Sequence, residues 1–159
     1  MSHNKKIVIA VIVVGLAGYF LSQQFRIGGD GEEHITNQKV TVYKSPTCGC
    51  CGKYISHLKQ NGYEVETIMT DDMDSVKAEH NIPDSMESCH TTIVGDYFVE
   101  GHVPLVAIDK LLEGKPNVDG IALPGMPSGS PGMPGPQQEP FNVFTVTDGE
   151  PSSWLAINQ

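Results

Sequence analysis

The sequence predicts an α/β domain with the element order β-α-β-α-β-β-α, followed by an extension rich in proline, glycine and methionine that ends in an added strand. The β-branched, alternating run Lys39 to Lys44 predicts a strand, and a helical pattern follows it after a short turn. Helical segments also separate the early strands, which favours a parallel pair there. A Gly95-Asp96 turn between two short strands predicts an antiparallel hairpin at the sheet edge.

Each further element of this domain has its own local signal. In the first helix Tyr54, Ile55 and Leu58 recur at helical spacing, and Asn61-Gly62 supplies a left-handed stop. The second helix opens with acidic residues, which suit the positive end of a helix, and a proline opens the third. The predicted bounds are a strand at 39–44, a helix from 51 to the stop at 61–62, a strand at 64–69, a helix at 72–80, strands at 91–94 and 97–100, a helix at 104–114 and a strand at 141–147.

Residues 1–27 have the organisation of a signal peptide or signal anchor. Lys5 and Lys6 precede the apolar run Ile7 to Leu21, and no obvious small-x-small cleavage site follows it, so we expect an uncleaved membrane anchor; the alternative is a leader whose cleavage leaves a soluble domain. The positive-inside rule then puts the remainder outside the cytoplasm. Residues 28–38 are polar and glycine-rich, as in a flexible linker between a membrane and a domain.

The charge of the chain excludes one class of partner. The formal net charge is −9 at pH 7, and loss of the leader's lysines would make it more negative. Such a chain is not expected to bind a phosphate backbone, so we exclude nucleic acid as a partner. The chain after the leader has the length of one small domain, and one hydrophobic core is expected.

The predicted order, with a C-x-x-C spacing from Cys48 to Cys51 at the turn between the first strand and the first helix, resembles the thioredoxin-like fold. In that fold the loop that enters the third strand packs beside the cysteine turn. Here the segment 88–91 (SCHT) occupies this place instead of the usual cis-proline. The resemblance therefore implies that Cys89 approaches the other three cysteines, whereas Pro104 falls at a helix start and should be trans.

Four thiols in one place leave four interpretations open. Two structural disulfides are common in exported proteins, although the adjacent Cys50 and Cys51 would form a strained ring. A catalytic dithiol would use Cys48, at a helix N-terminus, as the nucleophile and Cys51 as the resolving thiol, with Cys50 as an interfering third sulfur. A structural zinc site is the third interpretation, but such sites usually take their ligands from two separated C-x-x-C pairs, whereas here three cysteines share one turn and the fourth is alone. Monovalent copper suits the surplus sulfur better, because soft thiolates select Cu(I) and can bridge several ions.

Further soft or borderline ligands accompany the cysteines. His90 follows Cys89 directly, and His102 lies at a strand-to-helix turn that the fold directs to the same end. Two Pro-Gly-Met-Pro motifs, at 124–127 and 131–134, offer a methionine each. The candidate metal ligands are Cys48, Cys50, Cys51, Cys89, His90, His102, Met126 and Met133. The strand at 141–147 is expected to join a sheet edge and hold the methionines over the metal end, and residues around Trp154 to pack as a tail or remain mobile.

Four ordered motifs together resemble the CopG family of periplasmic copper-resistance proteins. They are residues 45–51 (SPTCGCC), 88–91 (SCHT), 100–104 (EGHVP) and 124–133 (PGMPSGSPGM). The resemblance covers roughly residue 39 to the final strand. It implies a thioredoxin-like copper-binding domain at 39–115, an extension at 116–159 packed on the same domain, and a role in copper tolerance in the periplasm of a Gram-negative bacterium.

These observations lead to a functional hypothesis. The domain is expected to bind more than one copper ion through bridging cysteines and to buffer copper or cycle it between Cu(I) and Cu(II), as a copper oxidoreductase would. Its partners would be copper ions and a copper-efflux or electron-transfer protein. The alternative is a thiol-disulfide oxidoreductase in the same compartment, and a copper chaperone is a third interpretation.

Overall fold

The computed structural model describes residues 37–158. Its elements, in chain order, are β1 (Lys39–Lys44), α2 (Gly49–Gln60), β2 (Glu64–Met69), α3 (Met73–Glu79), the short 3-10 helix η1 (Asp84–Met86), β3 (His90–Val94), β4 (Tyr97–Gly101), α4 (Leu105–Gly114), β5 (Gly120–Leu123), β6 (Phe141–Thr147) and β7 (Glu150–Ile157). The predicted leader at 1–27, and the predicted linker up to residue 36, lie outside the described residues. Within the described part, no helix has the length and apolar character that a membrane crossing needs.

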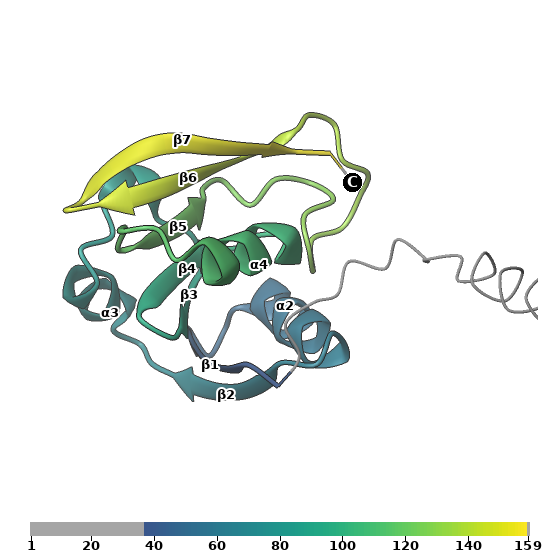
Figure 1. The fold of residues 1–159 in the computed structure, drawn as a ribbon. Helices are drawn as coiled ribbons and strands as arrows, with labels where there is room; N and C mark the ends of the chain where they lie inside the picture. Colours follow the sequence, from purple (N-terminus) through teal and green to yellow (C-terminus); the bar gives the residue numbers. More distant parts are fainter. Residues whose placement is uncertain (1–36, 159) are drawn as a thin grey trace, which may run out of the picture. The chain divides into compact units, whose positions relative to one another are not determined.

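Seven strands form one mixed sheet in the order β2-β1-β3-β4-β5-β6-β7, which runs from the bottom to the top of Figure 1. As predicted, β1 pairs with β2 in parallel, and β3 and β4 form an antiparallel hairpin. The hairpin's predicted place at the sheet edge is wrong, because β5 adds in parallel to β4. β5 itself was not predicted, because all of its residues (GIAL) are buried and the strand lacks the alternation of apolar and polar residues that marks a half-buried strand.

The C-terminal hairpin confirms one predicted strand and corrects one expectation. β6 begins at Phe141 and ends at Thr147, as predicted. The expected tail around Trp154 is wrong, because these residues form β7, which pairs antiparallel with β6. The strands join through Asp148 and Gly149, whose φ angles of 53° and 77° are typical of a tight hairpin turn. Most β7 side chains are exposed, so the strand has no apolar pattern to reveal it.

The helix ends follow the predicted signals, with two differences. The first is that α2 begins at Gly49, two residues before its predicted start. Asp72 caps α3 through its side chain, and Gly62 takes a left-handed φ of 89° after α2. After α4 the left-handed residue is Lys115, with a φ of 43°, whereas Gly114 is still helical. Pro104 is trans, as expected, since the described residues contain no cis peptide bond.

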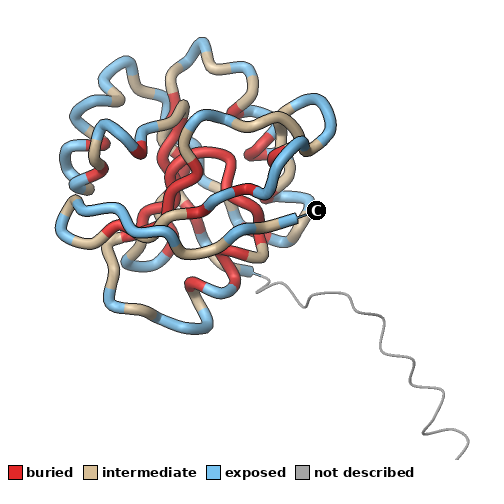
Figure 2. Tube along the Cα trace, turned by 90° about the horizontal axis from the view of Figure 1, so that it is seen from above, coloured by how far each residue is buried: buried red, intermediate tan, exposed pale blue. Residues whose placement is uncertain are grey.

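The sheet carries an apolar cluster on each face. The larger cluster packs α2 and α4 against one face, and β6 contributes Phe141 and Val143 to it. The smaller cluster lies on the other face, because Phe98 alternates with Val99 along β4 and clusters with Met86 of η1. The buried segments, red in Figure 2, therefore include strands from the extension as well as from the first part of the domain.

Candidate metal centre

The cysteine turn lies between β1 and α2. β1 ends at Lys44 and α2 begins at Gly49, so Cys48 is the N-cap residue and Cys50 and Cys51 lie in the first helical turn. Cys48 and Cys51 form a disulfide, which is the pair that the dithiol hypothesis uses, and Cys50 is free. The cysteine turn therefore lies at the N-terminus of α2, which is the positive end of the helix dipole.

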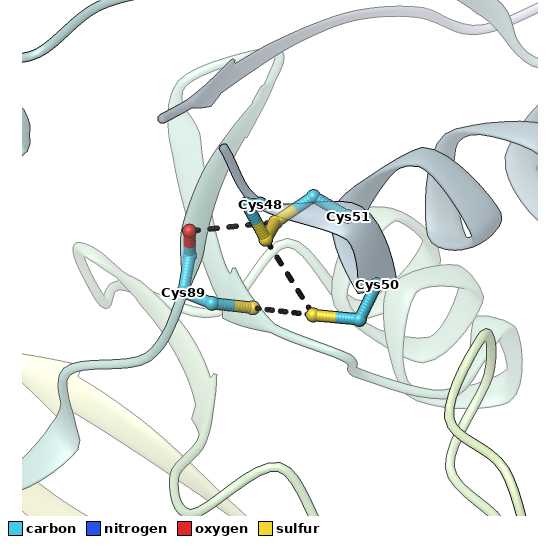
Figure 3. Close-up of side chains that lie close together, drawn as sticks. All are labelled: Cys48, Cys50, Cys51 and Cys89. Atoms are coloured by element: carbon cyan, nitrogen blue, oxygen red, sulfur yellow. Dashed lines mark hydrogen bonds between the residues drawn. A yellow bond between two sulfur atoms is a disulfide. The ribbon is translucent and has the colours of Figure 1, made fainter. Parts of the chain in front are cut away.

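Cys89 reaches this turn from the loop between η1 and β3, as Figure 3 shows. The Sγ atom of Cys89 lies 3.8 Å from that of Cys50, which in turn lies 3.5 Å from that of Cys48. Cys51 Sγ lies 3.5 Å from the Cys89 carbonyl oxygen. The four Sγ atoms all lie within 4.8 Å of one another. The expectation that Cys89 approaches the other three cysteines is thus confirmed.

Two fully buried histidines contact the Cys89 sulfur. It lies 3.3 Å from His90 Nδ1 and 3.2 Å from His102 Nε2. His102 Nδ1 lies 2.7 Å from the Pro131 carbonyl oxygen, which can only accept, so Nδ1 carries the proton. Nε2 therefore directs its lone pair towards Cys89, in the tautomer that a metal ligand needs. Cys89, His90 and His102 make a second group of ligand atoms around one shared sulfur.

Tyr54 packs against both histidines, although it was not among the predicted site residues. Its ring centroid lies 4.7 Å from that of His90 and 5.3 Å from that of His102. Its hydroxyl donates to the Val103 carbonyl oxygen at 2.9 Å. Helical spacing identified Tyr54 as a buried residue of α2, but the histidines come from β3 and the turn after β4. Only the packing of these elements shows that the tyrosine ring limits how far either imidazole can move.

Burial keeps His90, His102 and the Cys89 thiol uncharged in the absence of a cation. Desolvation, and then the neighbouring His102, lower the pKa of His90 to about 3. Desolvation also lowers the pKa of His102, so both imidazoles are neutral at pH 7 and able to bind a metal ion. Desolvation and the nearby Cys50 raise the pKa of the Cys89 thiol to about 12. A metal ion that binds Cys89 must therefore displace a proton.

The two predicted methionine ligands lie on the loop between β5 and β6, here called the methionine loop (residues 124–140). Met126 is 39% exposed and has a φ of 48°, and Met133 is half-buried. Between them, Pro131 makes the loop's hydrogen bond to His102. The methionine loop thus contacts the site through its backbone, and coordination by its two thioethers stays a prediction.

Gly132 determines how closely the methionine loop approaches α2. Its φ is 82°, and a Cβ atom there would lie 2.7 Å from the Tyr54 backbone nitrogen. Gly132→Ala is expected to push the loop away from the helix and weaken the bond from His102 to Pro131, because helix backbone cannot rotate aside. Left-handed strain and overpacking together predict a loss of about 2–5 kcal/mol in the free energy of unfolding. Urea unfolding measures this loss, and the His102 ring signals in NMR spectra report the bond.

Gly125→Ala is the matched control for this prediction. Gly125 lies in the same loop with a φ of 80°, but a Cβ atom there would meet nothing within 4 Å. This variant should lose only the backbone term, about 1–2 kcal/mol, and leave the His102 signals unchanged. Equal losses in the two variants would show that contact with α2 does not hold the methionine loop in place.

The donor atoms in this site fit a soft metal ion. The two groups of ligand atoms contain four cysteine sulfurs and two imidazole nitrogens, and no carboxylate belongs to either group in the described part of the chain. Thiolate and imidazole ligands suit copper and zinc, whereas carboxylate and carbonyl oxygens suit magnesium or calcium. The disulfide between Cys48 and Cys51 occupies two of the sulfurs. The full set of thiolate ligands therefore exists only in the reduced protein.

The chain is similar to solved copper-resistance proteins. A structure named "Copper resistance protein copG- Form 1" is 40% identical, with a TM-score of 0.71, and the match covers 77% of this chain and 99% of that chain. The chain belongs to the CopG family. A second structure, "Copper resistance protein copG- Form 2", matches with the same values. A family model described as "Protein of unknown function, DUF411" matches residues 86–133, and no curated protein sequence matched.

Membership of the CopG family confirms the resemblance predicted from the four sequence motifs. The segment matched by the family model contains Cys89, His90, His102, Met126 and Met133. The mixed α/β architecture of the described residues is that of a CopG-like chain, with one sheet and three α-helices. The cluster of four cysteines is compatible with metal binding, and both related structures are named as copper-resistance proteins.

Proposed function

We propose that this CopG-family protein binds copper in the periplasm and holds more than one Cu(I) ion in a thiolate-bridged cluster, as part of copper resistance. The observation that carries the proposal is the convergence of four Sγ atoms within 4.8 Å of one another. Soft thiolates select Cu(I) among the common metal ions. The names of the related structures add support, because both are copper-resistance proteins.

The number of donor atoms favours a cluster over a single ion. Structural zinc takes four ligands in a tetrahedron. This site offers four sulfurs and two imidazole nitrogens, and Cys89 belongs to both groups of ligand atoms. A thiolate shared in this way can bridge two ions, so His90 and His102 would bind on one side of Cys89 and the cysteine turn on the other. The buried neutral imidazoles add no charge that would oppose a second cation.

A cluster that changes oxidation state would act as a copper oxidoreductase. Each Cu(I) that becomes Cu(II) releases one electron, and each Cu(II) that is reduced takes one, so turnover needs an electron-transfer partner protein. The sulfurs of the cysteine turn can also exchange two electrons, as the Cys48–Cys51 disulfide indicates. A copper-efflux protein would be the partner that removes the ions. The predicted N-terminal anchor would keep the domain at the inner membrane.

A thiol-disulfide oxidoreductase is the second candidate function, and the disulfide favours it. Cys48 is partly exposed and Cys51 is fully buried, as expected for an attacking and a resolving thiol at a helix N-terminus. The order of β1 to α4 supports a thioredoxin-like arrangement. Cys50 weighs against this function. Its Sγ lies 3.5 Å from that of Cys48, so Cys50 would compete with Cys51 to form a disulfide with Cys48.

Copper reconstitution tests the proposed function. Reduced protein is expected to bind more than one Cu(I) ion per chain, and protein with an intact Cys48–Cys51 disulfide fewer, because oxidation removes two of the four thiolates. Metal analysis after anaerobic dialysis gives the stoichiometry. X-ray absorption at the copper edge reports sulfur ligation and the distance between copper ions.

Two results would contradict the cluster: one copper ion per reduced chain, or tighter binding of zinc than of Cu(I) under the same conditions. The variants Met126→Leu and Met133→Leu keep an apolar side chain but remove the thioether. A loss of copper in either variant would assign a ligand to the methionine loop, and unchanged binding would remove both methionines from the proposed ligand set.

A further inference from the structure

Lys77 and Glu100 form a buried ion pair on the face of the sheet that α3 covers. Lys77 is 4% exposed and Glu100 is 0% exposed, and the ammonium contacts the carboxylate directly. The desolvation of two charges often exceeds the attraction between them, so a buried ion pair is weak evidence for stability. Its best-attested use is to hold a structure in one arrangement. The contacts of this pair show which segment it holds.

The pair holds both backbone polar groups of Ser88, the residue before Cys89. Lys77 Nζ donates to the Ser88 carbonyl oxygen at 2.8 Å, and the Ser88 N–H donates to Glu100 Oε1 at 2.6 Å. The second carboxylate oxygen, Glu100 Oε2, accepts from Thr91 Oγ1 at 2.6 Å. A single carboxylate therefore binds the chain on both sides of Cys89.

The segment that carries Cys89 has no regular secondary structure to hold it in place. Residues 87–89 lie between η1 and β3 and belong to neither element. Cys89 Sγ must nevertheless meet Cys50 Sγ at 3.8 Å and His102 Nε2 at 3.2 Å. A displacement of about 1 Å in a supporting segment is enough to spoil a ligand site. Glu100 also lies close to a candidate ligand in sequence, because one residue separates it from His102.

We propose that Glu100, paired with Lys77, is a positioning residue of the metal centre, which holds residues 88–91 so that the Cys89 sulfur meets the cysteine turn and His102. It acts through the backbone of Ser88 and the hydroxyl of Thr91 and does not bind the metal itself. Its effect on sulfur geometry stands on the contacts alone. Its effect on copper rests on the function proposed above.

The first test measures sulfur geometry without copper. In a Cys48→Ser/Cys51→Ser background, only Cys50 and Cys89 remain, with their Sγ atoms 3.8 Å apart. Diamide, which takes two electrons and two protons from a pair of thiols, is expected to join them as a disulfide. Adding Glu100→Ala should slow this cross-link roughly 10- to 100-fold, because rates fall steeply when reacting atoms are misplaced. The cross-link is followed by mass spectrometry after alkylation of the remaining thiols.

The matched control is Asp109→Ala, which removes another buried carboxylate. Asp109 lies in α4, is 8% exposed and accepts from the Tyr63 hydroxyl at 3.2 Å. It should leave the rate of cross-linking unchanged even if it lowers stability. Glu100→Gln should restore much of the rate, because its amide oxygen can accept from the Ser88 N–H. An unchanged rate in folded Glu100→Ala, or an equal loss in the Asp109 variant, would overturn the proposal.

A variant with a smaller change covers the case in which Glu100→Ala does not fold. Thr91→Val keeps the shape of the side chain and removes only the hydroxyl that binds Glu100 Oε2. It should slow cross-linking less than Glu100→Ala is expected to, but measurably, and a folded Thr91→Val protein with the parent rate would contradict the proposal. Circular dichroism establishes that each variant is folded.

The second test uses the protein with all four cysteines. Competition with a Cu(I) chelator should show about 10- to 100-fold weaker copper binding in Glu100→Ala, the loss typical of residues that orient ligands, and no change in Asp109→Ala. Slow cross-linking in Glu100→Ala, together with a parent protein that binds no copper cluster, would refute the proposed function and keep the positioning role. A copper cluster in the parent, together with unchanged cross-linking, would refute the positioning role alone.

Discussion

Cys50→Ser is expected to lower Cu(I) affinity by more than about 100-fold and to remove the multi-copper cluster, while the Cys48–Cys51 disulfide still forms. Loss of residues that merely orient ligands costs 10- to 100-fold in metal affinity, so loss of a central ligand should cost at least the upper value. Cys50 Sγ lies between two neighbours, 3.5 Å from Cys48 Sγ and 3.8 Å from Cys89 Sγ. Serine offers a hard oxygen that Cu(I) disfavours. Chelator competition and metal analysis measure both effects.

The same variant separates the two candidate functions. A thiol-disulfide oxidoreductase needs only Cys48 and Cys51, so Cys50→Ser should keep the activity in an insulin-reduction assay and Cys48→Ser should abolish it. A copper protein should instead lose copper in the Cys50 variant, whether or not it reduces insulin. Copper stoichiometry and affinity that stay at the parent values in Cys50→Ser would contradict the thiolate-bridged cluster.

Phe141→Ala is expected to destabilise the domain by about 3–5 kcal/mol, the usual loss for a phenylalanine buried in a core. Phe141 is 2% exposed and belongs to the same apolar cluster as Val40 of β1 and Leu58 of α2. Its strand, β6, pairs with β5, so the C-terminal segment shares one hydrophobic core with β1 and α2, the elements on either side of the cysteine turn. Urea unfolding at a fixed redox state of the cysteines measures the loss.

Asn142→Ala is the control for this prediction, because the neighbouring side chain of β6 is exposed. It should change stability by no more than about 0.5 kcal/mol. A loss below about 1 kcal/mol in Phe141→Ala would mean that β6 packs loosely, and residues 39–115 would then be expected to fold without the extension. A full loss would make residues 39–157 one cooperative unit in unfolding.

Local signals were sufficient for most of the fold up to α4. The alternating run in β1, the helical spacing of Tyr54 and Leu58, and the Gly95-Asp96 turn each depend on neighbours in sequence, so they could be recognised without a structure. β5 and β7 were missed for opposite reasons, because one strand is wholly buried and the other is mostly exposed. Neither shows the alternation by which a half-buried strand is found.

The candidate site was predictable only in part. The sequence showed the motifs that carry the candidate ligands, namely the CxCC turn, the SCHT and EGHVP segments and the two methionine motifs. The resemblance to the thioredoxin-like fold predicted that Cys89 approaches the cysteine turn, and the structure confirms it. The contact of Tyr54 with both histidines, and the hydrogen bond from His102 to Pro131, were not predictable. These contacts join residues from different elements, and they depend on how the helices and the methionine loop pack.

The amino-acid sequence alone determined which donor atoms this CopG-family chain possesses and which predicted helices and strands they lie beside or within. The approach of Cys89 to the cysteine turn was predicted, but only the tertiary structure decided that its sulfur also contacts two neutral histidines. The tertiary structure alone also decided that Lys77 and Glu100 bind the backbone of Ser88, the residue before Cys89. Helix caps, turns and the alternation of apolar and polar residues along a strand depend on residues that are close in sequence. The distances between distant donor atoms arise from packing across the whole sheet, in which the last strands take part as fully as the first.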